Sequence, residues 1–221
     1  MDLILLSGGL GKRAKLNYPK QLMRLGGKPM LIYVLEIFKK VKNIGKIIIT
    51  VPENIKYYDE LLKSYGIKNV NIIIGGKTRQ ESVYFALLQC SGNEVIIHES
   101  VRPFINFDFL DKLIHTESEN VVPIIGNSET MYDKRFGYLK RENIYRIQLP
   151  QKFNLDKLLL AHTNARESNL SFTDDSSLYN YYFTDDIVFI NGLEENIKIT
   201  TPLDIQLAFV IYKSLVEGDE L

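Results

Sequence analysis

Short apolar runs alternate with longer amphipathic segments along most of this 221-residue chain. A short continuous apolar run is typical of a buried strand, and an apolar period of 3.6 residues is typical of a helix. The runs predict strands at 3–6, 47–51, 70–74, 95–98, 121–125 and 187–190. The amphipathic segments predict helices at 30–41, 55–65, 79–89, 108–117, 155–166 and 203–215. Strands that alternate with helices favour parallel βαβ units, so we expect an α/β fold with a doubly wound, mostly parallel sheet.

One segment interrupts this alternation. Residues 126–147 contain Gly, Asn, charged and aromatic residues without a helical period. Two short strands at 130–132 and 138–140 would form a hairpin around the turn at 134–137. An insertion of this length in a compact domain is usually functional or binds a partner. We therefore expect a single domain over residues 1–221 with an inserted β-arm at 126–147.

Composition excludes several classes of protein. The 27 Lys and Arg residues balance 27 Asp and Glu residues, so no overall field attracts nucleic acid or an acidic membrane. The single cysteine, Cys90, excludes a disulfide or a cysteine metal cluster within one chain. No long apolar run and no signal-peptide pattern are present, which predicts a cytoplasmic protein without a membrane span.

A glycine-rich turn follows the first predicted strand. Gly8, Gly9 and Gly11 remove every Cβ atom from this turn, so that backbone N–H groups can close on a bulky anion. Arg13 and Lys20 follow, and they would neutralise further negative charge. The pattern indicates a polyphosphate site and therefore a nucleotide.

Two other glycine motifs fit less well. Residues 9–14 match the dinucleotide fingerprint, which needs a helix that opens directly from the turn and an acid about 20 residues later. Pro19 breaks such a helix early, and the first acid after the strand at 47–51 is Glu53. A Walker A loop fails because no Gly-Lys-Ser/Thr is present there. An ordinary strand-to-helix turn without a ligand remains open for the glycines alone.

A second glycine-rich turn follows the third predicted strand. Gly75 and Gly76 precede Thr78, a candidate N-cap, and Glu81 three residues later completes a capping box. Ser82 lies about one turn into the predicted helix, where its hydroxyl could meet a base or a phosphate. Helix capping alone would also explain these residues.

Charged residues follow the fourth predicted strand. Beside a triphosphate, Glu99 would be a magnesium ligand, because Mg²⁺ is held by one or two carboxylates together with phosphate oxygens. The alternative is an ion pair of Glu99 with Arg102 across a turn. His98 fits a buried, hydrogen-bonded residue at a strand end better than a catalytic base.

Two late segments complete the set. Thr173 and Asp174 have the pattern of a helix cap. Lys198 lies between two isoleucines, where an unpaired ammonium group would be costly, so it needs an anionic ligand or a carboxylate partner such as Asp174.

This inventory suits nucleotidyl transfer, in which a phosphate oxygen attacks the α-phosphorus of a nucleoside triphosphate and pyrophosphate leaves. A phosphate monoester has a second pKa of about 6, so no histidine base is needed at neutral pH. Catalysis would depend on positioning and on neutralising the charge that builds on the phosphates.

The ordered motifs resemble those of the sugar- and polyol-phosphate cytidylyltransferases. This family includes the methylerythritol-phosphate cytidylyltransferases of isoprenoid synthesis and the ribitol-5-phosphate cytidylyltransferases of wall and capsule polymers. The resemblance covers essentially the whole chain and rests on residues 7–13, 19–21, 75–83, 98–103, 150–153, 173–174 and 196–202.

The resemblance implies a Rossmann-like nucleotidyltransferase domain whose arm makes a homodimer. It implies CTP and a polyol phosphate as substrates and Mg²⁺ as cofactor, held by Glu99. The catalytic residues that it implies are Arg13, Lys20 and Lys198. The implied CTP-binding residues are Ser7, Gly8, Gly9, Gly11, Gly75, Gly76 and Ser82. The implied acceptor-binding residues are Arg102, Thr173 and Asp174, together with Thr130 and Arg141 from the arm of the neighbouring subunit.

The sequence departs from the family pattern at Glu99, where aspartate is usual. The Gly-Gly loop and residues 100–104 and 200–202 resemble the polyol-phosphate branch, so ribitol 5-phosphate is the preferred acceptor. The alternatives are the methylerythritol-phosphate branch and a relative that binds CTP without transferring it. An NAD(P) oxidoreductase ranks third.

Overall fold

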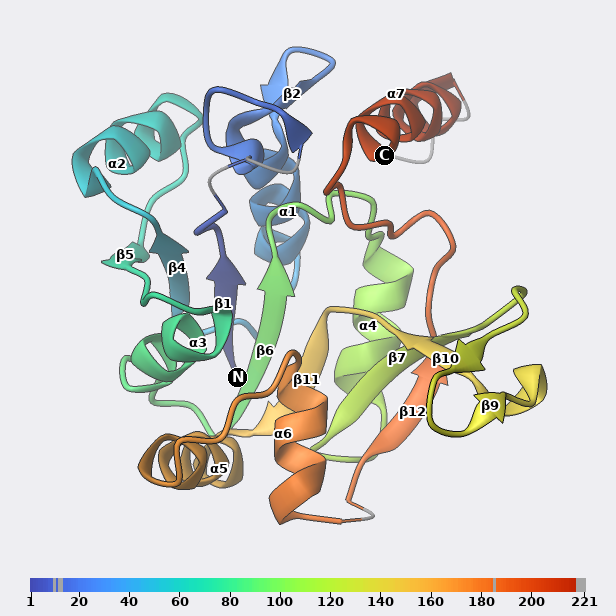
Figure 1. The fold of residues 1–221 in the computed structure, drawn as a ribbon. Helices are drawn as coiled ribbons and strands as arrows, with labels where there is room; N and C mark the ends of the chain where they lie inside the picture. The colour runs from blue at the N-terminus through green and yellow to red at the C-terminus, as the bar shows by residue number, and fades with distance from the viewer. Residues whose placement is uncertain (10, 12–13, 185, 218–221) are drawn as a thin grey trace.

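The computed structural model describes residues 1–9, 11, 14–184 and 186–217. Within these residues, eight strands form one sheet in the order β10-β7-β11-β6-β1-β4-β5, with β12 also paired to β7 (Figure 1). The strands are β1 (Asp2–Leu6), β4 (Ile47–Val51), β5 (Val70–Ile74), β6 (Glu94–Glu99), β7 (Val121–Gly126), β10 (Tyr145–Ile147), β11 (Gln151–Asn154) and β12 (Val188–Asn191). The α-helices are α1 (Met30–Lys39), α2 (Ile55–Ser64), α3 (Arg79–Leu87), α4 (Phe107–His115), α5 (Leu155–Glu167), α6 (Asp175–Tyr182) and α7 (Pro202–Glu217).

The sheet is mostly parallel at its centre. Strand β1 pairs in parallel with β4 and β6, and β4 pairs in parallel with β5. Strand β11 runs antiparallel to β6, and β10 runs antiparallel to β7. The predicted α/β fold and all twelve predicted elements are confirmed, with boundaries that differ by a few residues at most.

Helices cover both faces of the sheet. One apolar cluster joins β1 and β4 to α1, α2 and α4, and it includes Leu35, Phe38 and Leu113. A second cluster joins the other face to α3, α5 and α6, and it includes Val83 and Leu158. The two clusters anchor the sheet from both sides, so the carboxyl ends of the parallel strands form a fixed edge.

Helix α6 and strand β11 were not predicted, and neither has a clear apolar period. Helix α6 has the sequence Asp-Ser-Ser-Leu-Tyr-Asn-Tyr-Tyr, in which two buried apolar residues are only one position apart. Strand β11 carries Lys152, whose Nζ atom is buried and donates to the carbonyls of Ile114 (3.0 Å) and Thr116 (3.1 Å). Contacts with distant carbonyls therefore decide the conformation of β11, and a local pattern does not contain them.

The segment between β7 and β10 projects from the end of the sheet (Figure 1). Its strands β8 (Tyr132–Asp133) and β9 (Gly137–Tyr138) form the predicted hairpin. Strand β10 returns to the main sheet, so the projecting part ends before Tyr145. The hairpin side chains of Tyr132, Phe136 and Tyr138 are 63%, 75% and 80% exposed. Exposed aromatic side chains gathered on one hairpin are typical of an interaction site.

No helix among the described residues is both long enough and apolar enough to cross a lipid bilayer.

Candidate active site

A cavity of about 460 Å³ lies at the carboxyl edge of the parallel strands. Its lining brings together the loops after β1, β5 and β6, which are far apart in the sequence. Nine of the predicted site residues line it: Ser7, Gly8, Gly9, Lys20, Gly75, Gly76, Ser82, Glu99 and Lys198. The predicted gathering of these residues at one sheet edge is confirmed.

The first glycine turn serves two purposes. Gly11 has a φ of +75°, and a Cβ atom there would lie 2.7 Å from the carbonyl oxygen of Tyr18, so the turn itself requires glycine. A Cβ atom on Gly8 would meet nothing within 4 Å, so Gly8 leaves open space beside the cavity. The predicted catalytic Arg13 lies outside the described residues.

Lys20 is buried beside this turn. Lys20 is the first residue of the short 3₁₀ helix Lys20–Leu22 and is only 7% exposed. The Nζ atom donates to the carbonyl of Ile199 at 2.9 Å. A cation held by the backbone at the wall of a cavity is suited to neutralising a phosphate oxygen there.

The second glycine turn is held by Ser82. The Ser82 hydroxyl accepts from the N–H of Gly76 (3.0 Å) and donates to the carbonyl of Thr78 (2.8 Å). A Cβ atom on Gly75 would lie 2.8 Å from that hydroxyl. The predicted cap is present, because Thr78 Oγ1 accepts from the N–H of Glu81 at 3.0 Å. The hydroxyl of Ser82 thus orders the glycine loop that borders the cavity.

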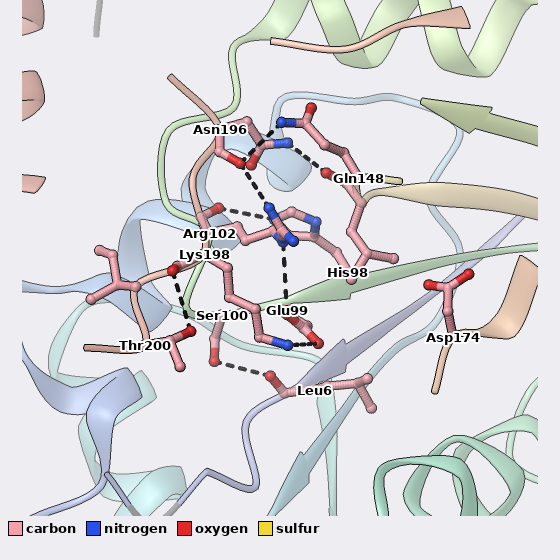
Figure 2. Close-up of polar contacts among 12 residues, drawn as sticks. Leu6, His98, Glu99, Ser100, Arg102, Gln148, Asp174, Asn196, Lys198 and Thr200 are labelled. Carbon is pink, nitrogen blue, oxygen red and sulfur yellow. Dashed lines mark hydrogen bonds and ion pairs between the residues drawn. The ribbon is translucent and has the colours of Figure 1, made fainter. Parts of the chain in front are cut away.

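Three cations surround the carboxylate of Glu99. Its Oε1 atom lies 2.9 Å from Lys198 Nζ and 3.4 Å from Arg79 Nε, and its Oε2 atom lies 3.7 Å from Arg102 Nε. Figure 2 shows Lys198 and Arg102 converging on Glu99 while Asp174 lies apart. The predicted pair of Glu99 with Arg102 is present. The suggestion that Asp174 partners Lys198 is wrong, because the Nζ atom of Lys198 is paired with Glu99.

These contacts set the charge of Glu99. Burial alone would raise the pKa of its carboxyl, but the neighbouring Lys198 and Arg79 hold the pKa below its usual value. Glu99 is therefore ionised at neutral pH.

The residues present allow one mode of Mg²⁺ binding. Within the described part of the chain, no three His, Cys, Asp or Glu residues group as metal ligands. The buried Oε2 atom of Glu99 has no hydrogen-bond partner among the described residues. One carboxylate suffices where phosphate oxygens supply further ligands, so Glu99 fits a cation that arrives with a triphosphate.

A second cavity of about 360 Å³ adjoins the first. Its lining includes the predicted acceptor residues Arg102, Thr173 and Asp174. Arg79, Glu99 and Lys198 line both cavities, so these three side chains form a shared wall.

Asp174 lies at the smaller cavity, whereas the predicted arm residues Thr130 and Arg141 lie away from both cavities. Asp174 caps α6, as the sequence suggested, and accepts from the N–H of Ser176 at 2.9 Å. Thr130 and Arg141 are exposed on the projecting segment and do not line either cavity of their own chain.

Arg79 and its buried partners, Asp175 and His162, were not among the predicted site residues. Arg79 Nη2 lies 2.6 Å from Asp175 Oδ2, and Asp175 Oδ1 lies 3.1 Å from His162 Nε2. The available signal was an arginine at the first position of a helix that follows a Gly-Gly turn. Asp175 gave no signal, because an acid in the first helical turn is ordinary helix chemistry.

His98 is fully buried at the end of β6, as predicted, and its Nε2 atom lies 3.0 Å from the carbonyl oxygen of Arg102. Burial lowers the pKa of His98 from 6.5 to about 4. As pH falls below 6.5, the unfolded chain takes up this proton before the folded chain does. The contribution of neutral His98 to the free energy of unfolding is therefore complete above pH 6.5 and is lost towards pH 4.

We expect His98→Gln to reduce the loss of unfolding free energy between pH 6.5 and 4 by up to about 3 kcal/mol relative to the parent chain. Urea unfolding at several pH values measures this difference. His115→Gln is the matched control, because the His115 side chain is 63% exposed. An equal pH dependence in His98→Gln and the parent chain would contradict the expectation.

The chain is similar over most of its length to a family of known proteins. Residues 1–214 match the family model described as IspD: 2-C-methyl-D-erythritol 4-phosphate cytidylyltransferase. The bifunctional enzyme IspD/IspF of Pelagibacter ubique is 38% identical over 92% of this chain, which spans 55% of that protein's length. The 2-C-methyl-D-erythritol 4-phosphate cytidylyltransferase of Clostridium botulinum is 32% identical, over 91% of this chain and 94% of that protein.

A relative with another acceptor in its name is similar at nearly the same level. The ribitol-5-phosphate cytidylyltransferase of Vibrio parahaemolyticus is 31% identical, over 98% of this chain and 96% of that protein. Among solved structures, the 4-diphosphocytidyl-2C-methyl-D-erythritol synthase of Anaerococcus prevotii superposes with a TM-score of 0.84. It is 26% identical, and the match covers 96% of this chain and 95% of that one.

Proposed function

We propose how this chain, which belongs to the 2-C-methyl-D-erythritol 4-phosphate cytidylyltransferase (IspD) family and is a CTP-dependent cytidylyltransferase, binds its two substrates. The larger cavity binds CTP, and the smaller cavity binds 2-C-methyl-D-erythritol 4-phosphate. The observation that carries this proposal is the shared wall of Arg79, Glu99 and Lys198. Two phosphate-bearing substrates in adjoining cavities with cations between them are arranged for transfer from one to the other.

In this proposal, a phosphate oxygen of the acceptor attacks the α-phosphorus of CTP, and the bond to the pyrophosphate oxygen breaks. Lys20, together with Arg13, neutralises the charge that builds on the triphosphate. Lys198 orients the acceptor phosphate from the shared wall. The rest of the acceptor is bound by Arg102, Thr173 and Asp174, which line the smaller cavity. The acceptor phosphate is already largely ionised, so no side chain has to remove a proton.

The two glycine turns would bind CTP. Ser7, Gly8, Gly9 and Gly11 present backbone to the phosphates. Gly75 and Gly76 would contact the cytidine, and Ser82 would contribute by holding that loop in place.

A divalent cation belongs to the proposal. Glu99 would hold it together with phosphate oxygens, as the orphaned Oε2 atom allows. When bound, the cation supplies Lewis-acid stabilisation of phosphate charge.

The acceptor remains a choice between two branches of the family. The family model and the Clostridium botulinum relative carry the methylerythritol-phosphate name, so we place this acceptor first. Ribitol 5-phosphate, which the loop sequences favoured, is the second candidate and is supported by the Vibrio relative.

The test is pyrophosphate release from CTP and Mg²⁺ with 2-C-methyl-D-erythritol 4-phosphate, ribitol 5-phosphate and glycerol 3-phosphate offered separately. We expect release with the first and a kcat/KM at least about 100-fold lower with the others, since polar acceptor contacts discriminate strongly. Release with ribitol 5-phosphate instead would reverse the order of the two candidates. CTP binding without release from any acceptor would support a relative that binds CTP without transferring it.

The projecting arm would complete the site of a second subunit. We infer that Thr130 and Arg141, which lie away from both cavities of their own chain, contact the acceptor in the neighbouring subunit of a homodimer. The exposed aromatic residues of the arm support an interface there.

Subunit exchange tests this arrangement. Lys20→Met and Arg141→Ala chains are each expected to be inactive as homodimers. A mixed dimer has one site with both defects and one site with neither, so half of its sites regain activity. Tagged heterodimers purified after exchange give the measurement. Purified heterodimers without any recovery would place Arg141 in its own chain's site or outside the site altogether.

A further inference from the structure

A line of polar side chains in contact runs from the α5–α6 interface to the shared wall. His162 on α5 contacts Asp175 at the start of α6 (3.1 Å), Asp175 contacts Arg79 at the start of α3 (2.6 Å), and Arg79 contacts Glu99 at the end of β6 (3.4 Å). The side chains of His162 and Asp175 are 0% and 1% exposed. Of the four, only Arg79 and Glu99 line the two cavities.

Arg79 lies closer to the carboxylate of Asp175 than to that of Glu99. Its Nη2 atom is 2.6 Å from Asp175, whereas its Nε atom is 3.4 Å from Glu99. Both oxygens of Asp175 are engaged, one by His162 and one by Arg79, so the carboxylate cannot turn. Burial would raise the pKa of Asp175, but Arg79 and His162 hold it well below its usual value, so this carboxylate stays ionised.

We propose that Asp175, fixed by His162, is a positioning residue that holds Arg79 away from full pairing with Glu99. Glu99 thereby keeps carboxylate charge available to the divalent cation of the CTP complex. A guanidinium group pairs with a carboxylate most strongly through two parallel hydrogen bonds. Without Asp175, Arg79 turns to Glu99 in this way and competes with the cation. The inference rests on the function proposed above.

The test is Asp175→Asn, which keeps the shape of the side chain and removes its charge. The readout is the affinity for Mn²⁺ of the complex with a non-hydrolysable CTP analogue, measured by electron paramagnetic resonance without turnover. We expect this affinity to fall about tenfold, the usual size of coupling between contacting charged groups. Asp175→Ser, whose residue type is tolerated in the first turn of a helix, gives the same test if the asparagine variant does not fold.

A double variant separates positioning from general damage to the fold. If Asp175 acts only through Arg79, removing Arg79 as well relieves the competition. We therefore expect Arg79→Gln/Asp175→Asn to bind Mn²⁺ within about threefold of Arg79→Gln, and more tightly than Asp175→Asn alone. A merely structural role of Asp175 would give no such rescue.

The matched control is Asp186→Asn. Asp186 accepts from Lys157 on α5 (2.7 Å) and from Tyr179 on α6 (2.9 Å), so it joins the same two helices without contacting Arg79. It is expected to keep the Mn²⁺ affinity of the parent chain.

The outcomes distinguish the two proposals. If the parent chain binds the CTP analogue and Mn²⁺, but Asp175→Asn binds Mn²⁺ equally well or the double variant shows no recovery, the positioning role is overturned. If the parent chain does not bind the analogue, the proposed function fails, and the positioning role fails with it.

Discussion

Replacing Lys20 with methionine is expected to lower kcat for cytidylyl transfer about 1,000-fold, the size seen when one preorganised charge-stabilising group is lost. The Nζ atom of Lys20 is buried and held by the carbonyl of Ile199, so it needs little reorganisation when charge builds on a phosphate oxygen. Methionine keeps much of the apolar stem and loses only the charge. Pyrophosphate release at saturating CTP measures the effect.

Lys28→Met is the matched control for this variant. Lys28 pairs with Glu36 at 2.6 Å and does not line either cavity, so its removal should leave kcat within about twofold of the parent chain. Calorimetry should show that Lys20→Met still binds CTP, because most binding contacts remain. A Lys20→Met chain with a normal kcat would remove Lys20 from the catalytic group.

Glu99→Gln is expected to lower kcat/KM at least about 100-fold and to raise the Mg²⁺ concentration needed for half-maximal activity. Lys198, Arg79 and Arg102 would lose their common carboxylate partner. The three cations would then repel one another and fold back on the phosphates of CTP. We expect a modest loss of stability, about 1–2 kcal/mol, because solvent screens the partly exposed cations. Thermal unfolding and a Mg²⁺ titration of the rate provide the two measurements.

Glu99→Asp separates charge from reach. It keeps the carboxylate and shortens the side chain by one methylene, so we expect it to retain activity within about tenfold of the parent chain. If glutamine at this position supported normal rates at every Mg²⁺ concentration, Glu99 would have only a structural role in the ion-pair cluster.

Much of the fold could be predicted because its signals are local. The central strands are continuous apolar runs such as Leu3–Leu6, and the helices that cover them have an apolar face. Helix α6 and strand β11 could not be predicted, because their stability comes from distant partners. The buried Lys152 in β11 shows this, since its Nζ atom is satisfied by carbonyls 38 and 36 positions away.

The candidate site divides in the same way. The positions of the glycine turns and cations that follow strands can be predicted from the sequence, because parallel strands end at one sheet edge. The pairing of those charges depends on side-chain reach across the edge. Lys198 therefore has Glu99 as its partner, 99 positions away, rather than Asp174. The contact between Arg79 and Asp175, 96 positions apart, follows from how α5 packs against both α3 and α6 and leaves no trace in either local sequence.

The shared wall has a consequence for how the two substrates meet. Arg79, Glu99 and Lys198 face both cavities, so whatever occupies one cavity changes the electrostatic potential in the other. Binding free energies are reciprocal: the factor by which CTP changes affinity for the acceptor is the factor by which the acceptor changes affinity for CTP. With CTP and the acceptor in the two cavities as proposed, we expect their binding equilibria to be linked through these three side chains, so that a scheme with independent sites would not describe them.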